Sequence, residues 1–477
     1  MYTIDRIYIN GQFVQPHGQE WFNLYNPSKG DMIGRVRLAD AQDTQDAIAA
    51  ARRAFPAFSR TSKEQRVTWL RRLHEAMLAK IDQVAAATTE EYGAPATRAL
   101  WGARYAADSF LNAAQTLEAY SFTRRIASAQ VVMEPVGVAA LITPWNANAG
   151  FICNKLATAI AAGCSVVIKP SEMSAIQTQI VSEALHDAGL PPGVFNIVTG
   201  RGDVVGAELT SNPHIAKISF TGSTAVGKSI LRAGADTMKR VTLELGGKSP
   251  TLILDDADLA TAVPLAITSG FMNSGQACIA GTRILVPESS LTDVIRLIKE
   301  FVSKIKVGSL QDPDSAIGPM VSQRQYERVQ GYIRRGIEEG ATLVVGGEGH
   351  PDGLTGYYVK PTVFANVKND MSIAREEIFG PVLCILTYSS EEEAIGIAND
   401  TVYGLQAYVI SPDVDRARAV AARLEAGRVI INGAPHEPLA PFGGFKQSGI
   451  GREYGTFGLE AFLESKAVLG ATTKGPQ

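Results

Sequence analysis

Val136-Gly-Val-Ala-Ala-Leu-Ile142 and Ser165-Val-Val-Ile168 are two short apolar runs that predict neighbouring β-strands. Between them, the turn Thr143-Pro-Trp-Asn146 leads into a segment with helical spacing, from about Phe151 to Ala162. Buried strands that alternate with helices are typical of a parallel sheet with helices on both faces. These residues therefore predict an α/β fold that binds ligands at the carboxyl ends of its strands.

The same alternation continues along the chain and then recurs in a second region. Strand-like runs at Val194–Val198 and Ile215–Phe220 are each followed by a helical segment. Gly246-Gly247 separates them from further strands and amphipathic helices. Upstream, residues 41–58 and 62–92 have apolar positions at helical spacing. We therefore expect two α/β regions that meet at about Gly246.

Composition and charge limit the classes of function. The chain has 477 residues, 45% hydrophobic and 19% charged, which is ordinary for a globular protein. The net charge of −3 and the lack of a Lys/Arg-rich run predict no nucleic-acid partner. The most apolar stretch, residues 136–168, is interrupted by polar residues and is a poor membrane span. We expect no membrane partner.

The cysteines give an expectation about the compartment. Cys153, Cys164, Cys278 and Cys384 lack metal-ligand spacing, so no metal site is expected. Four thiols in a chain of this length favour a reducing environment. The N-terminus lacks the basic segment and long apolar core of a signal peptide. These features predict a soluble, cytoplasmic protein.

Cys278 and Glu244 are a candidate nucleophile and base. Cys278 ends the turn Phe271-Met-Asn-Ser-Gly-Gln-Ala-Cys278, and Glu244 lies in Val241-Thr-Leu-Glu244. A free cysteine is only a few per cent ionised at neutral pH, so a nucleophilic thiol needs a nearby proton acceptor. Such chemistry requires the fold to bring Glu244 near Cys278. The alternative is a buried structural thiol, which is what most free cysteines are.

A glycine-rich segment suggests a different class of enzyme. Gly222-Ser-Thr-Ala-Val-Gly-Lys-Ser229 matches the phosphate-loop pattern, follows a strand and opens a helix. It therefore permits a phosphoryl-transfer hypothesis. However, it follows about the fourth strand rather than the first, and it leaves Glu244 and Cys278 without a role. A helix N-terminus after such a turn also suits a dinucleotide pyrophosphate, or it forms a turn without a ligand.

Two further polar groups follow predicted strands. Asn146 comes after the strand at 136–142, where its side-chain N–H suits the stabilisation of a carbonyl oxygen that gains negative charge. Glu172 follows the next strand in Lys169-Pro-Ser-Glu172, where an acid accepts hydrogen bonds from an adenine ribose and repels a 2′-phosphate. The alternatives are a turn asparagine that bonds its own backbone and an acid that complements a helix dipole.

The chain resembles the aldehyde dehydrogenase superfamily of the NAD(P)-dependent, hydrolytic type. The resemblance rests on motifs that occur in the family's order and span most of the chain. They are Pro144-Trp-Asn146, Lys169-Pro-Ser-Glu172, Phe220-Thr-Gly-Ser-Thr224, Leu243-Glu-Leu-Gly-Gly-Lys248, Gly275-Gln-Ala-Cys278, Glu376-Glu-Ile-Phe-Gly-Pro381 and the segment from Pro441 to Glu453. The phosphate-loop match then corresponds to the family's pyrophosphate turn.

The resemblance implies a mechanism and roles for four residues. Cys278 attacks the aldehyde carbon to form a thiohemiacetal, and Asn146 and the Cys278 backbone N–H bind its oxygen. Hydride transfer to NAD leaves a thioester, and Glu244 activates the water that hydrolyses it to a carboxylic acid. Lys155 corresponds to a lysine that relays protons from the general base. An acid at Glu244 favours hydrolysis over the alternative of a CoA-acylating enzyme.

The resemblance also implies the cofactor, which is NAD, with NADP as an alternative. Glu172 favours NAD because it corresponds to an adenine-ribose contact, as does Lys169. Trp145 and Ser223 correspond to groups near the phosphates, and Glu377 corresponds to a nicotinamide-ribose contact. The full set of cofactor-binding positions is Ile142, Trp145, Lys169, Glu172, Gly222, Ser223, Val226, Leu245, Glu377 and Phe379.

The family fold implies three parts. Residues 1–119 and 136–246 correspond to a Rossmann-like dinucleotide-binding domain, and residues 247–455 to an α/β catalytic domain. Residues 120–135 and 456–477 correspond to a small β-ribbon oligomerisation element. The segment Thr123–Glu134 is polar and alternating, which independently predicts an exposed ribbon. The resemblance implies a homodimer or a homotetramer.

Departures from the family pattern bear on the small-molecule aldehyde substrate. Asn154 and Met272 stand where many relatives have aromatic residues, which predicts a wider pocket than one for acetaldehyde. The loop Gly433–Ala440 is expected at the substrate mouth, where His436 and Glu437 either contact a polar substrate or are solvated. No arginine in these segments is placed for a substrate carboxylate. We therefore expect a non-acidic aldehyde.

Overall fold

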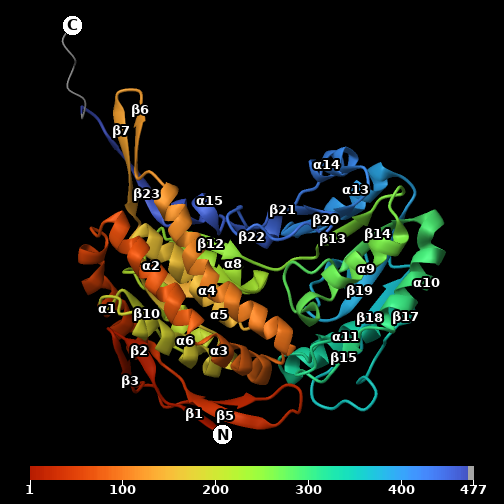
Figure 1. The fold of residues 1–477 in the computed structure, drawn as a ribbon, viewed down its shortest axis with the longest axis horizontal. Coiled ribbons are helices and arrows are strands. Elements are labelled where there is room, and N and C mark those ends of the chain that lie inside the picture. Colours follow the sequence, from red (N-terminus) through yellow and green to blue (C-terminus); the bar gives the residue numbers. More distant parts are fainter. Residues whose placement is uncertain (471–477) are drawn as a thin grey trace.

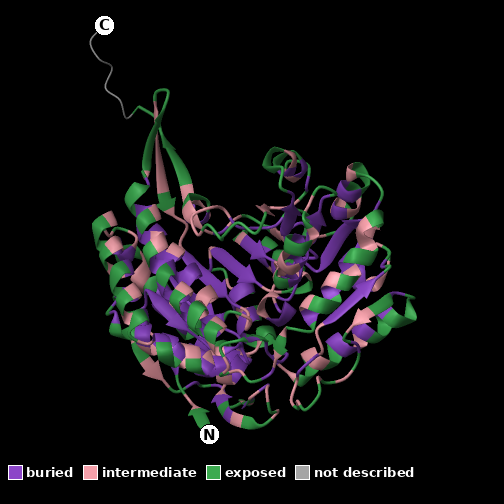
Figure 2. Cartoon of the chain, turned by 45° about the vertical axis from the view of Figure 1, so that its right-hand side comes forward, coloured by how far each residue is buried: buried purple, intermediate pink, exposed green. Residues whose placement is uncertain are grey.

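The computed structural model describes residues 1–470. Two helix-covered sheets form the two halves of the molecule, and a narrow ribbon projects from one of them (Figure 1). The central strands of both sheets are buried, whereas the covering helices expose their outer faces (Figure 2). The expected α/β fold with two sheets is confirmed.

The first sheet is eight-stranded, in the order β22-β12-β11-β8-β9-β10-β2-β3. Its strands are β2 (Ile7–Ile9), β3 (Gln12–Val14), β8 (Val138–Ile142), β9 (Ser165–Lys169), β10 (Phe195–Ile197), β11 (Lys217–Thr221), β12 (Arg240–Glu244) and β22 (Gly449–Ile450). Strands β8 to β12 run parallel, and β2, β3 and β22 add antiparallel edges. The chain passes from β8 through β9 to β10 and then returns to place β11 on the other side of β8. Such a reversal opens a crevice at the carboxyl ends of the strands.

Helices cover both faces of this sheet. They are α1 (Ala41–Phe58), α2 (Lys63–Leu78), α3 (Ile81–Ala87), α4 (Ala96–Ala119), α5 (Asn148–Ala162), α6 (Ala175–Asp187), α7 (Ala207–Ser211) and α8 (Thr224–Ala235). Along β8, Ala139 and Leu141 belong to one hydrophobic cluster, whereas Val138 and Ala140 belong to the other. This alternation of period two places apolar residues on both faces of the sheet.

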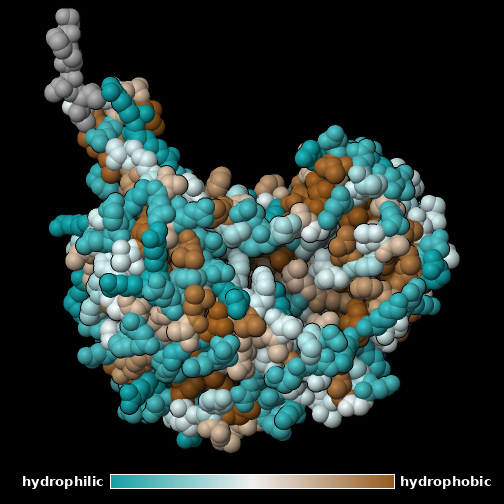
Figure 3. All heavy atoms as spheres, viewed as in Figure 1, coloured by the Kyte–Doolittle hydropathy of each residue, from teal (hydrophilic) through white to brown (hydrophobic). Residues whose placement is uncertain are grey.

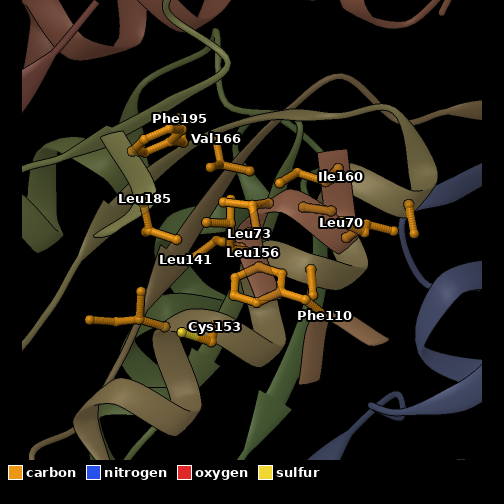
Figure 4. Packing of buried hydrophobic residues seen from close by; sticks show 14 of the residues in the cluster. Leu70, Leu73, Phe110, Leu141, Cys153, Leu156, Ile160, Val166, Leu185 and Phe195 are labelled. Carbon is orange, nitrogen blue, oxygen red and sulfur yellow. The ribbon is translucent and has the colours of Figure 1, made fainter. Parts of the chain in front are cut away.

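The hydrophobic cluster under α2, α4 and α5 is the largest in this half. Figure 4 shows Leu70, Phe110 and Leu156 converging on strand residues such as Leu141. The Cys153 thiol lies within this cluster and is fully buried, so it is a structural cysteine. Burying an apolar side chain of this size contributes roughly 1.5–3 kcal/mol. The cluster therefore fixes the position of α5, and with it the turn Thr143–Asn146 that precedes the N-terminus of this helix.

One expected helix is divided in the structure. Residues 62–92 form α2, α3 and a π-helical turn, Thr88–Tyr92, rather than one continuous helix. The sequence between Leu78 and Ile81 contains neither glycine nor proline, so nothing local marks the break. The break between α2 and α3 lets Ile81 and Val84 pack into the same hydrophobic cluster as residues of α4. Tertiary packing therefore overrides helical propensity here.

The second sheet is seven-stranded, in the order β17-β18-β19-β14-β13-β20-β21, and all its pairs are parallel except β17–β18. Its strands are β13 (Pro250–Ile253), β14 (Arg283–Pro287), β17 (Thr342–Val345), β18 (Thr362–Ala365), β19 (Val382–Tyr388), β20 (Gln406–Ile410) and β21 (Arg428–Ile431). Its helices are α9 (Leu259–Gly270), α10 (Leu291–Val302), α11 (Gln323–Glu338), α12 (Ser372–Arg375), α13 (Glu391–Asn399) and α14 (Val414–Ala421). The chain therefore changes sheets between Glu244 and Pro250.

Smaller sheets complete the fold. β1 (Tyr2–Ile4), β5 (Met32–Arg37) and β4 (Trp21–Tyr25) form one, and β15 (Lys306–Val307) pairs with β16 (Ser315–Ile317). The projecting ribbon consists of β6 (Thr123–Ile126), β7 (Ala129–Pro135) and β23 (Leu463–Val468), which follows α15 (Gly455–Glu460). The last part of the expected oligomerisation element, residues 471–477, lies outside the described residues. Among the described helices, none combines the length and apolar character needed to cross a membrane.

Candidate active site

A cavity of about 470 Å³ lies where the two halves meet. Cys278, Glu244 and Asn146 all line it, so the fold brings together residues that lie far apart in the sequence. The space-filling view shows this face hollowed between the halves, with hydrophobic residues near the hollow and hydrophilic residues on the outer helices (Figure 3). The cavity therefore holds a thiol, a carboxylate and an amide in one place.

The turn before Cys278 has an unusual backbone. Asn273, Ser274 and Gly275 have φ angles of 52°, 59° and 73°, in the left-handed region. Positive φ at a residue other than glycine costs about 1–3 kcal/mol and is often found at functional sites. A Cβ atom on Gly275 would lie 2.1 Å from the Gly380 carbonyl oxygen. The turn therefore packs tightly against the backbone of Gly380 and fixes the position of Cys278, which follows it.

Asn146 is held against this turn by its side-chain amide. Its Nδ2 donates to the Gln276 carbonyl oxygen at 3.0 Å, and Asn273 Nδ2 donates to the Asn146 carbonyl oxygen at 3.0 Å. An amide nitrogen has two N–H groups, so one remains for another acceptor. This arrangement positions Asn146 beside Cys278 rather than in a turn bonded to its own backbone.

The electrostatic environment of the cavity favours the uncharged forms of Cys278 and Glu244. Burial raises the pKa of Cys278 to about 12, with further raising by Glu377 and Glu244 and an opposing effect of Arg428. Burial also raises the pKa of Glu244 well above its ordinary value, with Glu453 adding to it. Neither oxygen of Glu244 has a hydrogen-bond partner within residues 1–470. The raised pKa makes the carboxylate form of Glu244 a stronger base, which suits it to take a proton from a reacting group once it is ionised.

Lys155 lies in a buried polar network and is not among the residues that line the cavity. Its Nζ donates to Ser219 Oγ at 3.0 Å and forms an ion pair with Glu453. The Ser219 hydroxyl also donates to Glu453 Oε1 at 3.2 Å. Both ionic side chains are almost fully buried, so each charge depends on the other. Glu453 lies near enough to raise the pKa of Glu244, which connects this network to the cavity.

The expected cofactor positions gather at the carboxyl edge of the first sheet. Ile142, Lys169 and Glu244 are the last residues of β8, β9 and β12, and Gly222 and Ser223 follow β11. Ile142 and Leu245 pack in the cluster beneath this edge. Val226, in the first turn of α8, leaves 47% of its surface exposed. Lys169 Nζ lies 3.5 Å from Glu172 Oε2, so the adjacent acid lies beside the same strand end.

Glu377 and Phe379 close the other side of this edge. Glu377 Oε1 accepts a hydrogen bond from the Gly247 backbone N–H at 3.1 Å, and burial raises its pKa to about 7. The Phe379 ring lies edge-on to Trp145, with ring centroids 5.4 Å apart. Glu377 therefore holds the backbone where the chain passes between the two sheets, and Phe379 contacts a ring from the first half of the molecule.

Buried polar atoms without partners also mark this edge. The hydroxyl oxygens of Thr143 and Thr221 and both oxygens of Glu244 lack a hydrogen-bond partner within residues 1–470. They follow or end β8, β11 and β12; β8 and β11 flank the reversal of strand order, and β12 lies next to β11. Buried polar groups are costly when unpaired. A polar ligand in the crevice would satisfy them.

The phosphate-loop match does not form a phosphate loop. Gly227, Lys228 and Ser229 lie inside α8, whose N-cap is Ser223, rather than at its start. A Cβ atom on Gly227 would lie 2.6 Å from a Leu245 methyl group, so this glycine allows close packing. Lys228 is exposed and donates to Gln447 Oε1 at 2.9 Å. Lys228 therefore does not take the position that a phosphoryl-transfer enzyme requires of its phosphate-loop lysine, which argues against that hypothesis.

Comparisons with known proteins agree with this geometry. The sequence profile described as the aldehyde dehydrogenase family matches residues 13–468. A 3-succinoylsemialdehyde-pyridine dehydrogenase from a Pseudomonas species is 48% identical over 466 residues, which cover 97% of this chain and 98% of that protein. The chain belongs to the aldehyde dehydrogenase family.

Solved structures of other aldehyde dehydrogenases have the same fold. A variant of aldehyde dehydrogenase C from Pseudomonas syringae, in complex with NAD+ and octanal, has a TM-score of 0.97 and 44% identity, covering 99% of this chain and 98% of that one. The Mycobacterium tuberculosis enzyme, in complex with NAD+, has a TM-score of 0.95 and 40% identity, covering 99% of each chain. Within residues 1–470, this aldehyde dehydrogenase has no cluster of three or more His, Cys, Asp or Glu residues suited to a metal ion.

Sequence reasoning missed three charged residues at the site. Glu453 ends the motif from Pro441 to Glu453, but nothing in that motif indicates its ion pair with Lys155. Arg98 on α4 and Arg428 at the start of β21 both line the cavity. The expectation about arginines concerned only the segments near the cysteine and the loop Gly433–Ala440, and neither Arg98 nor Arg428 lies in them. His436, in contrast, does line the cavity, and Glu437 is exposed.

Alkylation of the native protein tests the state of the thiol. Because burial raises the pKa of Cys278, less thiolate forms at any given pH than for an ordinary cysteine. The rate of reaction with iodoacetamide should keep rising above pH 9 without a plateau near 8.5. Cys153, Cys164 and Cys384 are fully buried, so Cys278→Ser should remove the fast-reacting site. A plateau at or below pH 8 contradicts this assignment.

Removing one member of the buried ion pair should destabilise the protein. Lys155→Met leaves Glu453 charged and unpaired, which should lower the free energy of unfolding by about 3–5 kcal/mol. The double variant Lys155→Met/Glu453→Gln should recover most of this loss. Denaturant unfolding followed by fluorescence measures both, with Lys228→Met on the exposed face of α8 as the control. Equal losses for Lys155→Met and Lys228→Met would be inconsistent with a buried pair.

Proposed function

We propose that this protein oxidises an aldehyde to a carboxylic acid with NAD as the hydride acceptor. The observation that carries the proposal is the convergence of Cys278, Glu244 and Asn146 in one cavity beside the carboxyl edge of a dinucleotide-binding type of sheet. Family membership supports the reaction class, and the NAD+ complexes of similar enzymes support the cofactor.

Each of the three residues has one chemical task. The Cys278 sulfur bonds to the aldehyde carbon, and its proton leaves to a base, which gives a thiohemiacetal. The free N–H of Asn146 and the Cys278 backbone N–H stabilise the negative oxygen. After loss of hydride the carbon is held as a thioester. Glu244 takes a proton from water, which attacks that carbon and releases the acid and the thiol.

The residues at the sheet edge suit a dinucleotide. Glu172 and Lys169 would hold the adenine ribose, and the exposed Val226 offers apolar surface beside it. Ser223 and the start of α8 would hold the pyrophosphate, beside Gly222 and Trp145. The oxygen of Glu377 that is not bonded to Gly247 would accept from the nicotinamide ribose, with Phe379 beside it. NAD supplies a cationic ring that accepts the hydride.

Lys155 and Glu453 would carry protons away from Glu244. The proposal rests on the buried network with Ser219 and on the influence of Glu453 and Lys155 on the pKa of Glu244. A network of this kind leads from the general base toward the C-terminal segment. It explains why two charges are buried at a site that must release protons in each turnover.

The cavity favours a substrate with an extended tail. Its volume of about 470 Å³ is larger than a two-carbon aldehyde needs, and small residues such as Gly102 and Ala103 line it. The Pseudomonas syringae enzyme forms a complex with octanal, and the Pseudomonas dehydrogenase is named after a pyridine-containing semialdehyde. Both aldehydes are larger than a two-carbon aldehyde. We therefore place a chain or ring of several carbons beside Cys278.

The arrangement of parts follows from the two sheets. We propose that residues 1–119 and 136–246 bind the cofactor, and that residues 247–455 supply the nucleophile. β22 is an exception, because it comes from the second segment and pairs with β12 of the first sheet. The ribbon of β6, β7 and β23 exposes Ile126 and Val468 and would join subunits of a homodimer or homotetramer. Four free cysteines favour the cytoplasm.

The two alternatives have less support. A phosphoryl-transfer enzyme would need Lys228 at a phosphate, but this side chain bonds Gln447. A CoA-acylating enzyme would have no use for a buried base beside its thioester, whereas Glu244 lines the same cavity as Cys278.

The roles of the thiol and the base are tested by one kinetic experiment. Mixing the enzyme with NAD and an alkanal should form NADH, and Cys278→Ala should form none. Glu244→Gln should keep a first burst of NADH stoichiometric with sites but lower kcat by about 10²–10⁴, because only hydrolysis lacks its base. Stopped-flow absorbance measures both phases. An unchanged kcat in Glu244→Gln would remove the base from the mechanism.

Cofactor preference tests Glu172. The carboxylate would repel the 2′-phosphate of NADP, so Glu172→Gln should raise kcat/KM for NADP relative to NAD by about ten- to a hundredfold. Steady-state rates with each cofactor measure the ratio. Asp187→Asn, at the far end of α6, is the matched control and should keep the wild-type ratio. No change in Glu172→Gln would place the ribose elsewhere.

A further inference from the structure

Two arginines line the cavity without a carboxylate partner. Both side chains are half-buried, and within residues 1–470 neither Arg98 nor Arg428 forms an ion pair, although arginines that are taken out of solvent are usually paired. Arg98 comes from α4 and Arg428 from β21, so they belong to opposite halves of the molecule. Two uncompensated positive charges in a substrate cavity favour an anion from the substrate.

Aromatic rings connect the two guanidinium groups. Arg98 stacks over Trp101, with its central carbon 4.1 Å from the ring centroid, and Trp101 stacks on Tyr105 at 5.3 Å. Tyr105 Oη lies 3.1 Å from His436 Nε2, and Arg428 Nη1 lies 2.8 Å from His436 Nδ1. We call Trp101, Tyr105 and His436 the aromatic rim. Trp101 and His436 are exposed, so the rim lies at the mouth of the cavity.

The hydrogen bonds of the rim leave the positive charge on the arginine. A guanidinium only donates, so Nδ1 of His436 accepts from Arg428, and Nε2–H donates to Tyr105. Partial desolvation of the ring and the neighbouring Arg428 lower the pKa of His436 to about 4, which keeps the ring neutral. Arg428 also donates through Nε to Gln406 Oε1 at 2.5 Å. Both partners are neutral, and Nη2 has no partner within residues 1–470.

Arg98 has even more free donor capacity. None of its N–H groups donates a hydrogen bond within residues 1–470, and burial lowers its pKa. Stacking on Trp101 holds the guanidinium plane against the cavity wall. A guanidinium fixed in this way presents two parallel N–H groups to a carboxylate.

We propose that the aromatic rim and its two arginines, Arg98 and Arg428, bind a carboxylate at the non-reacting end of the substrate. The substrate class is then an aldehyde acid, with its aldehyde at Cys278 and its carbon chain packed against Trp101 and Tyr105. This inference rests on the proposed aldehyde oxidation and reverses the expectation of a non-acidic aldehyde.

The rival role for Arg428 is support of the reacting groups, because it lowers the pKa of Cys278 against the effect of burial. Such a role would affect every aldehyde alike. Arg98 separates the two ideas, since it lies on the other wall and is not among the groups that shift the pKa of Cys278 or Glu244. The decisive readout is therefore a ratio between substrates rather than a rate.

The experiment compares three aldehydes of the same chain length: the unsubstituted alkanal, the aldehyde acid and the methyl ester of that acid. NADH formation gives kcat/KM for each with wild type, Arg98→Met, Arg98→Lys and Arg428→Met. Arg104→Met is the matched control, because Arg104 lies exposed on the same helix and does not line the cavity. Thermal unfolding checks that each variant folds.

Wild type should prefer the acid over the alkanal by at least about tenfold, and the ester should behave like the alkanal. Arg98→Met and Arg428→Met should each lower the acid-to-alkanal ratio by about ten- to a hundredfold, whereas Arg98→Lys keeps most of it. Arg104→Met should retain the wild-type ratio. The inference fails if wild type shows no preference for the acid, if the ester matches the acid, or if the ratio survives in Arg98→Met. Absence of NADH with all three aldehydes would instead overturn the proposed function.

Discussion

The close approach of backbone at Gly246 and Gly247 is the constraint on which the site depends. A Cβ atom on Gly246 would lie 2.4 Å from Glu377 Oε2, and one on Gly247 would lie 2.3 Å from the Cys278 carbonyl oxygen. Only residues without side chains let the segment that follows β12 pass between these groups. The passage brings Glu244, from the first sheet, to the same cavity as Cys278, from the second. A side chain here would separate the base from the nucleophile.

The strands and the central site residues could be predicted because their signals are local. The alternating apolar runs from Val136 onward place Asn146, Lys169 and Glu244 at one sheet edge, and motifs identify the thiol. The rest depends on contacts between distant parts of the chain. Nothing near Lys155 reveals its pairing with Glu453, and nothing near Arg98 reveals the cavity that it lines. The match at Gly222–Ser229 suggests a phosphate loop only because the motif does not specify where the helix begins, and α8 begins at Thr224, before the lysine.

The charges around Cys278 protect its thiol from side reactions in the absence of substrate. Burial and the acids Glu377 and Glu244 keep Cys278 protonated, and the thiolate is the form that oxidises and reacts with electrophiles. Arg428 at the cavity partly opposes this effect. A positively charged nicotinamide ring would shift the balance further in the same direction. The reactive form of the sulfur is then favoured when the cofactor is present to complete the reaction.

The pairing of β22 with β12 has a consequence for biosynthesis. Gly449 and Ile450 complete the edge of a sheet whose other strands are finished by residue 244. Glu453, which neutralises Lys155 in the core, comes from the same late segment. A nascent chain that still lacks these residues holds an unpaired strand edge and an unpaired buried lysine while the second half is being translated. The ribosome must therefore release almost the whole polypeptide before the first sheet reaches its final form, and a truncated product cannot serve as a partial enzyme.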